Sequence, residues 1–298
     1  MLKSYLVIKV SLKKIKDDNT YNVVRPPHLY IGFEKNELML KLFLLMGIIA
    51  IVSVIIMGLD AFIHIITALG VVLIFHSLVH SYQEWKGKMI AYETPASPMV
   101  AGLIVGLSMP IAAPFYITAL VALLMISVFK YGQGKVFKRK YLNPAAAAKT
   151  IFLLLLSVMI FFEDSLAKGL ILHPHHLELN LFTAEGFNDS MWIFDGKIIP
   201  ILGIELNAAQ GLVFWQTHGW IGGASGIIVL VIGIIGTYWL RFKWRIIIAG
   251  MASMTALSIL IGIVAGPDPF SRIAFHVFTG SFIFMVFFMA SEPQSTPM

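Results

Sequence analysis

The residues of this chain that could carry chemistry are mainly its histidines. His76 and His80 are four residues apart and share one face of a predicted helix. One helix cannot supply both axial ligands of a haem iron. His64 and His276, near the outer ends of two predicted helices, are the one pair at matching depth, but His276 belongs to a motif described below. The run His173-Pro174-His175-His176 has a proline that breaks regular geometry and no carboxylate at ligand spacing. We therefore predict neither a haem nor a metal ion.

Lys149 is the other residue of chemical interest, because it lies inside a long apolar segment. A charged side chain within a membrane span is costly, and it commonly marks an ion or proton path. Alternatively, Lys149 is close enough to the start of its helix to extend its ammonium group to the membrane surface. The sequence leaves both interpretations open.

The composition is that of an integral membrane protein. Hydrophobic residues make up 58% of the 298 residues and charged residues 13%, whereas soluble domains carry roughly 25% charged residues. The net charge is +6, but the basic residues gather beside apolar segments, which indicates membrane orientation and not nucleic-acid binding. The chain has no cysteine, which excludes disulfides, thiolate zinc sites and iron–sulfur clusters held by this chain.

Eight apolar segments are predicted as membrane-inserted helices, some of them short or broken, so we expect an all-α polytopic protein. Their approximate bounds are 38–59, 61–82, 99–109, 115–129, 145–162, 227–240, 246–265 and 273–290. The segments outside these helices can be numbered from the N-terminal arm as the first. The odd-numbered ones, together with the helix ends beside them, hold 19 of the 22 Lys and Arg residues. Because basic residues stay on the cytoplasmic side during insertion, both termini are predicted to be cytoplasmic.

This orientation divides the chain into four parts. Residues 1–37 are predicted to form a basic cytoplasmic arm, and residues 38–162 a first membrane half of five helices. Residues 163–218 would form an acidic extracytoplasmic loop, and residues 219–298 a partial second membrane half of three helices.

The third apolar segment, 99–109, is unusually short. A full span needs about 20 residues, so this segment is either a tilted span with a turn at the surface or a half-helix inside the protein. Pro110 and Pro114 close it, and irregular backbone at membrane depth survives only when protein or a cavity surrounds it. Gly102 and Gly106 are four residues apart and are expected to allow close contact with a neighbouring helix.

Four short motifs occur in order along the chain. They are Gly102–Pro110 with Pro114, Leu142-Asn143-Pro144-Ala145, the set Gly219, Gly222 and Ser225, and the set His276, Gly280 and Ala290-Ser291-Glu292-Pro293. Over roughly residues 26–298, these motifs resemble the NqrB/RnfD family of membrane proteins, whose members belong to the Rnf ferredoxin–NAD electron transport complex and to the sodium-pumping NADH–quinone reductase.

The resemblance implies a membrane subunit that passes electrons through flavin, coupled to Na⁺ or H⁺ movement, and that is inactive alone. It implies FMN or riboflavin as cofactor, other membrane and peripheral subunits as partners, and the cell inner (plasma) membrane as location. The candidate flavin-binding residues are Asn143, Pro144, Gly219, Gly222, Ser225, His276 and Gly280. The candidates for the ion pathway are Lys149, Ser108 and Glu292. The alternative for the glycines is that they only let helices touch.

Two features depart from the family pattern. Family members attach a flavin phosphate to a threonine in the outer loop, and residues 163–218 contain no such motif; Thr183 and Thr217 lie in a different context. This argues against covalent attachment. The family fold also implies two five-helix halves of inverted topology, and this chain stops where a ninth helix is expected. A solute channel or carrier, or a scaffold subunit without cofactor, is therefore the alternative function.

Overall fold

The computed structural model describes residues 35–86, 96–111, 113–133, 142–162, 197–199, 204–206, 213, 220–240, 242–265, 269–278 and 281–291. The predicted cytoplasmic arm up to residue 34 and most of the predicted outer loop fall outside these ranges. Statements about those two parts therefore stay predictions.

The first two helices form a tight hairpin, as the single-residue gap between the predicted segments 38–59 and 61–82 indicates. Helix α2 (Lys35–Met57) and helix α3 (Leu59–Trp85) are separated only by Gly58. Gly58 has φ 78° and ψ −153°, a backbone conformation that is open essentially only to glycine. This residue lets the chain reverse within one position, and the two helices contact each other.

Helix α2 has one apolar face for lipid and another for the protein interior. Its exposed apolar residues recur every three or four positions, as expected for one helical face, and they are Leu40, Leu44, Ile48, Ile51 and Ile55. The opposite face is buried and carries Met39, Leu42, Met46, Ile49 and Ser53. An exposed stripe of this size is typical of a helix that faces acyl chains.

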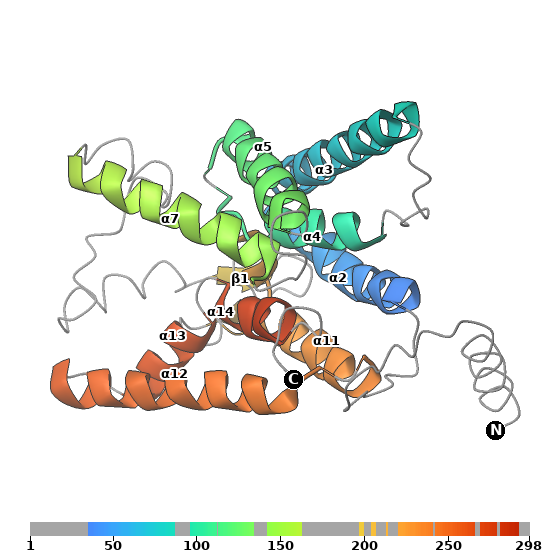
Figure 1. The fold of residues 1–298 in the computed structure, drawn as a ribbon. Helices are drawn as coiled ribbons and strands as arrows, with labels where there is room; N and C mark the ends of the chain where they lie inside the picture. The colour runs from blue at the N-terminus through green and yellow to red at the C-terminus, as the bar shows by residue number, and fades with distance from the viewer. Residues whose placement is uncertain are drawn as a thin grey trace, which may run out of the picture. The chain divides into compact units, whose positions relative to one another are not determined.

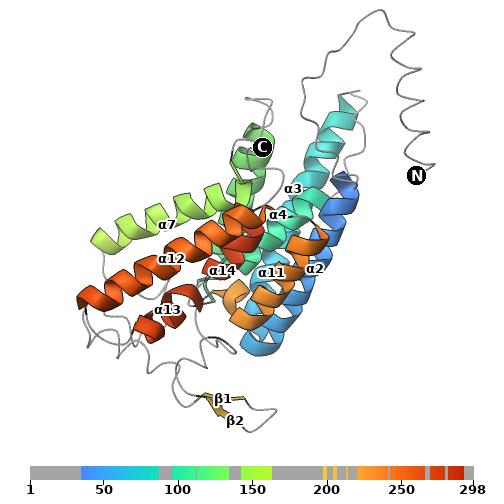
Figure 2. The same ribbon diagram turned by 90° about the horizontal axis from the view of Figure 1, so that it is seen from below.

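Helix α4 (Ala96–Leu107) is a buried half-helix. Every residue from Val100 to Leu107 is buried, and α4 contacts α2, α3, α5 and α7. Gly102 and Gly106 approach α3 closely: a β-carbon on Gly106 would lie 3.0 Å from the α-carbon of Ile65. The packing role predicted for these two glycines is therefore confirmed. Figure 2 shows α2, α3, α4 and α11 running side by side.

The remaining segments follow the predicted order. Helix α5 (Phe115–Leu124) continues into the π-helix η1 (Met125–Gly132), and α7 spans Pro144–Phe162. Strands β1 (Lys197–Ile199) and β2 (Ile204–Leu206) pair antiparallel, with Ile198 opposite Glu205. This small hairpin, within the predicted outer loop, was not expected from the sequence.

The C-terminal part begins with the short 3-10 helix η3 (Ile221–Gly223) and helix α11 (Gly226–Trp239). Helix α12 (Trp244–Ala265) follows and contacts α13 (Pro269–Phe278). The last segment comprises α14 (Phe282–Phe284) and the π-helix η4 (Met285–Ala290), and it bends by 55° from α13. Figure 1 shows α14 near the N-terminal end of α7.

All eight predicted apolar segments are helical, as expected for an all-α polytopic membrane protein. Within the described ranges, four helices are long and apolar enough to cross a membrane, or five if the bent pair forms one span. The shorter apolar helices are Ala96–Leu107, Pro144–Leu154 and Gly226–Trp239.

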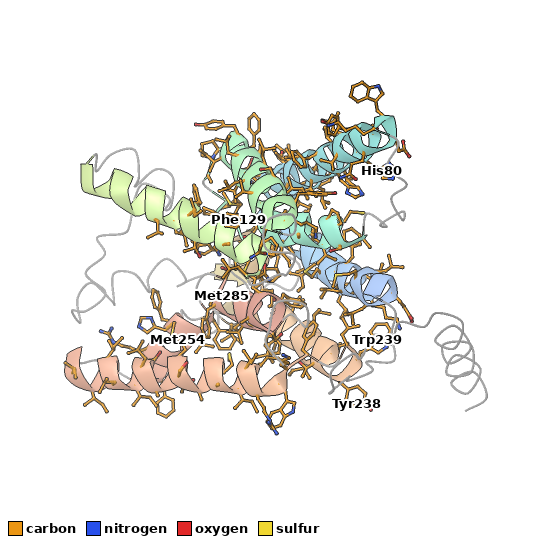
Figure 3. All side chains as sticks on the ribbon, viewed as in Figure 1. His80, Phe129, Tyr238, Trp239, Met254 and Met285 are labelled. Carbon is orange, nitrogen blue, oxygen red and sulfur yellow. The ribbon has the colours of Figure 1, made fainter. Side chains whose placement is uncertain are left out.

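Aromatic and basic residues mark one end of several helices. Tyr238 and Trp239 project from the C-terminal end of α11 (Figure 3), and Lys41 of α2 lies 5.5 Å from the centre of the Trp239 ring. The guanidinium of Arg245 lies 5.6 Å from the Trp244 ring at the start of α12. Such pairs are typical of a membrane–water interface, and basic residues favour its cytoplasmic side. The orientation stays a prediction, since Lys41 and Arg245 are among the basic residues on which it rests.

Candidate functional site

Two breaks in the helical structure meet inside the protein. The first is the turn after α4, and the second is the segment that leads into η3. Pro110 and Trp220 form an antiparallel bridge, and the Ile221 amide donates to the Met109 carbonyl over 3.0 Å. Backbone groups in a membrane need internal partners, and these two irregular segments provide them for each other. The structure thus favours the half-helix interpretation of the third apolar segment.

Gly222 is required where the two segments touch. A β-carbon at this position would lie 2.8 Å from the Leu107 carbonyl oxygen and 3.3 Å from the ring of Phe284. The space beside Gly222 is therefore filled by the end of α4 and by α14. For this glycine, the structure supports close packing, the alternative that the sequence left open.

Ser53 of α2 connects to the same junction. Its hydroxyl lies 2.8 Å from the Ile221 carbonyl oxygen and 2.8 Å from the Ile49 carbonyl oxygen of its own helix. A hydroxyl has one proton, so it donates to these two acceptors in a shared or alternating way. Sequence analysis missed Ser53, because a lone serine in an apolar helix usually bonds its own backbone.

Lys149 is buried inside the protein. Its Nζ donates to the Ser281 hydroxyl over 2.7 Å and lies 4.2 Å from the centre of the Trp220 ring. The side chain is 9% exposed. No carboxylate within the described ranges contacts the ammonium group. This arrangement differs from the snorkelling alternative and joins α7, the Trp220 junction and the start of α14.

Asn143 confirms the predicted start of α7 and forms one further contact. Its Oδ1 accepts the amide protons of Ala145 and Ala146 over 3.0 and 3.3 Å, as an N-cap residue does. Pro144 is the first residue of the helix, where its missing amide proton does no harm. In addition, Asn143 Nδ2 donates to the Met289 carbonyl in η4.

Ser225 and His276 present polar atoms that are buried and have no hydrogen-bond partner among the described residues. These atoms are the Ser225 hydroxyl oxygen and His276 Nε2. Ser225 is 2% exposed and precedes the first turn of α11. A β-carbon on Gly226 would lie 2.5 Å from the Phe278 ring, so the start of α11 packs against the helix that carries His276. Unsatisfied buried groups are costly and call for an explanation.

Of the remaining predicted site residues, the structure describes Ser108. Ser108 is fully buried, and its hydroxyl donates to the Val105 carbonyl over 3.0 Å, within its own chain segment. Gly219, Gly280 and Glu292 lie outside the described residues. Arg272, one residue before the predicted last segment 273–290, is a fully buried residue of α13.

Two of the histidines that invited a haem interpretation bond to hydroxyl groups. His64 Nδ1 lies 2.6 Å from the Thr118 hydroxyl, and His76 Nδ1 is bonded to the Tyr131 hydroxyl. Among the described residues, no group of three or more His, Asp or Glu side chains is placed to hold a metal ion. The run at residues 173–176 lies outside these residues.

Comparison with known proteins identifies relatives over nearly the whole chain. The model of the NQR2, RnfD, RnfE family matches residues 22–298. The D subunit of the ion-translocating oxidoreductase complex of Shewanella sediminis is 23% identical over 92% of this chain and 81% of that protein. The D subunit of the proton-translocating ferredoxin:NAD(+) oxidoreductase complex of Clostridium ljungdahlii is 22% identical over 94% and 81%. The B subunit of the Na(+)-translocating NADH-quinone reductase of Pseudoalteromonas atlantica is 29% identical over 38% and 29%.

Proposed function

Because this chain belongs to the NQR2, RnfD, RnfE family, we propose that it is a membrane subunit of an ion-translocating electron transport complex. The family match over residues 22–298 is the observation that carries this proposal. The matched relatives are named as subunits of ion-translocating oxidoreductase complexes, one of them for Na⁺ and another for protons. The chain would work with further membrane and peripheral subunits in the inner (plasma) membrane, with residues 163–218 on the extracytoplasmic side.

We propose that FMN or riboflavin binds where α11 begins beside α13. Two observations support this location: the Ser225 hydroxyl and His276 Nε2 are buried without a partner among the described residues. The isoalloxazine ring offers carbonyl oxygens and ring nitrogens that such groups can bond. When bound, the flavin supplies one- and two-electron chemistry. The chain would orient the ring and exclude water from it.

The other proposed flavin-binding residues would shape the backbone around this location. Asn143 and Pro144 fix the start of α7, and Gly222 lets the Trp220 junction approach α4. Gly219 and Gly280 flank this junction and the bend before α14 in the sequence. None of these residues is proposed to bond the ring directly.

We propose that a monovalent cation crosses the protein near the two helix breaks. Irregular backbone at such breaks frees carbonyl groups that can bind ions in transport proteins. Lys149 contacts Trp220 of the second break and Ser281 before α14, and Ser108 is the first residue of the turn after α4. Glu292 follows η4 in the sequence and would supply a carboxylate near the cytoplasmic end.

Flavin content and partner subunits test the proposal together. The full chain, expressed with its neighbouring subunits and a flavin transferase, is expected to co-purify with them and to carry a yellow flavin that denaturation releases. Fluorescence that stays on the denatured chain would show covalent attachment and contradict our expectation on that point. A chain without flavin and without redox partners would contradict the proposal, and would favour the solute carrier or the cofactor-free scaffold.

A matched pair of serine variants tests the location. Ser225→Ala removes the buried unpaired hydroxyl and is expected to lower the flavin content. Ser258→Ala is the control, because Ser258 already donates to the Met254 carbonyl over 2.7 Å. Equal flavin content in both variants would place the flavin elsewhere.

A further inference from the structure

Lys149 is the only ionisable residue in the sequence of α7, and it is buried without an opposite charge beside it. The described elements that pack most closely against α7 are α4, α5 and η1, and their sequences contain no Asp or Glu. Lys149 Nζ lies 2.7 Å from the Ser281 hydroxyl and 4.2 Å from the centre of the Trp220 ring. Because burial without a counter-charge favours the uncharged form of a group, we expect a neutral amine here.

The other titratable groups on the neighbouring elements do not pair with this amine. They are Tyr116 of α5, Lys130 and Tyr131 of η1, and Arg272 and His276 of α13. Lys130 donates to the Ser97 hydroxyl over 2.8 Å, and the Tyr131 hydroxyl is bonded to His76. Within the described ranges, the hydrogen bond of Lys149 goes to Ser281 and its ring contact is with Trp220. Both partners are uncharged.

These two partners suit both protonation states of an amine. A hydroxyl group can donate its proton to the lone pair of a neutral amine, and it can accept a proton from an ammonium group. The face of a tryptophan ring attracts a cation by its quadrupole and carries no net charge itself. The same surroundings do not suit a metal ion, because hard cations take about six oxygen ligands and the described residues offer one hydroxyl. A proton needs only the lone pair of the amine.

The position of the amine connects it to both helix breaks. Ser281 is the residue before α14, at the 55° bend from α13. Trp220 forms the bridge to Pro110 in the turn after α4. A movement of either segment would change one of the two contacts that hold an added proton on Lys149. The affinity of the amine for a proton is therefore coupled to the geometry of the breaks.

We propose that the Lys149 amine is a proton-binding site on the transport path, so that the ion carried by this subunit is H⁺. This inference rests on the proposed function for its role in transport. The lone pair of the amine forms an N–H bond with a proton from water on one side, and the resulting ammonium lies between Ser281 and Trp220. The proton returns to water on the other side when movement of a break withdraws one of these contacts. No electron is exchanged in this step.

NMR of the full chain in lipid nanodiscs, with an isotope label at the lysine ε-carbons, tests the site without flavin or partner subunits. Lys149→Met identifies the Lys149 signal by its loss. At neutral pH this signal is expected at the position of a neutral amine, and it should move reversibly to the ammonium position as the pH is lowered. An ammonium signal over the whole pH range, or a neutral amine that takes up no proton, would overturn the inference.

Lys41 provides the matched control in the same spectra. It also faces a tryptophan, at 5.5 Å from the centre of the Trp239 ring, but it forms an ion pair with Glu37 over 2.7 Å. Its signal should therefore stay that of an ammonium group at neutral pH. A neutral Lys41 would show that the membrane environment alone removes the proton, and would overturn the role given to the Lys149 surroundings.

Two tryptophan variants test whether the ring holds the added proton. Trp220→Leu removes the aromatic face and is expected to lower the ratio of ammonium to neutral amine at Lys149 by about fivefold at a given pH. Trp239→Leu, at the ring that faces Lys41, should leave this ratio unchanged. Equal ratios in the two variants would contradict a site formed by Trp220.

Proton movement by the assembled complex in sealed vesicles tests the role in transport. A pH-sensitive dye measures the protons moved per electron transferred. Lys149→Met and Lys149→Arg are both expected to lower this number, because a thioether binds no proton and a guanidinium does not release one. Lys149→His can bind and release a proton and should restore part of it, whereas Lys41→Met should leave it unchanged. An unchanged number in Lys149→Met would overturn the inference.

Failure of the inference and failure of the proposed function give different results. A wild-type complex that transfers electrons and moves Na⁺ but no protons would leave the proposed function standing and overturn the inference. A complex without electron transfer would count against the proposed function, and the NMR titration of the full chain would still decide whether Lys149 binds a proton.

Discussion

Asn143 and Met289, 146 residues apart in the sequence, are joined by a hydrogen bond from the Asn143 side-chain amide to the Met289 carbonyl, 3.1 Å long. The same side chain caps α7 through its carbonyl oxygen. One residue therefore starts a helix of the predicted first membrane half and fixes it to the last helix of the described chain. The acceptor lies in the π-helix η4, where the usual helical hydrogen bonding is altered.

Two variants of Asn143 should separate its two roles. Asn143→Asp keeps the capping oxygen and loses the amide donor to Met289, so we expect a loss of about 1 kcal/mol in the free energy of unfolding. Asn143→Ala loses both contacts, and we expect about 2 kcal/mol. Thermal unfolding of the full chain in detergent measures both. No loss in Asn143→Asp would show that the bond to Met289 adds nothing, and equal losses in the two variants would show that the capping contact adds nothing.

The sequence predicted those features that depend on neighbouring residues. The eight apolar segments are helical because each has enough consecutive apolar residues. Asn143 followed by Pro144 is a local signal for a helix start, and the Asn143 side chain caps α7 as expected. The gap of a single residue between the predicted segments 38–59 and 61–82 likewise indicates a tight turn, and the structure has that turn at Gly58.

The contacts that build the candidate site could not be predicted in this way. Lys149 and Ser281 are 132 residues apart, and Ser53 is 168 residues from Ile221. Their pairing depends on the packing of several helices and leaves no periodic signal in the sequence. The sequence identified Lys149 as unusual, but its partner could only come from the three-dimensional arrangement. The same holds for Arg272, whose burial follows from the early start of α13.

Gly222→Ala should disrupt the junction between η3 and α4. The new methyl group would lie 2.8 Å from the Leu107 carbonyl oxygen, and backbone cannot yield as a flexible side chain does. We expect a loss of about 2–3 kcal/mol in the free energy of unfolding. Gly70→Ala is the control, because nothing lies within 4 Å of a β-carbon there and alanine favours the helix. Similar melting temperatures for the two variants would contradict the close contact at Gly222.

Ser53→Ala should weaken the attachment of the Trp220 junction to α2. The variant removes the 2.8 Å hydrogen bond to the Ile221 carbonyl, at a position that is 1% exposed. We expect a loss of about 1 kcal/mol. The matched control is Ser253→Ala, since that exposed serine donates to the Gly250 carbonyl in its own helix. Differential scanning fluorimetry compares them, and an equal effect would mean that the cross-helix bond contributes nothing.

The orientation of the chain can be tested with single cysteines, because the natural sequence has none. Asp189→Cys lies in the predicted outer loop, and Lys138→Cys lies in the basic segment before α7. Basic residues resist transfer across the membrane. A membrane-impermeant maleimide applied to intact cells should therefore label Asp189→Cys, and should label Lys138→Cys only after the membrane is opened. Labelling of Lys138→Cys from outside would reverse the predicted topology and place residues 163–218 on the cytoplasmic side.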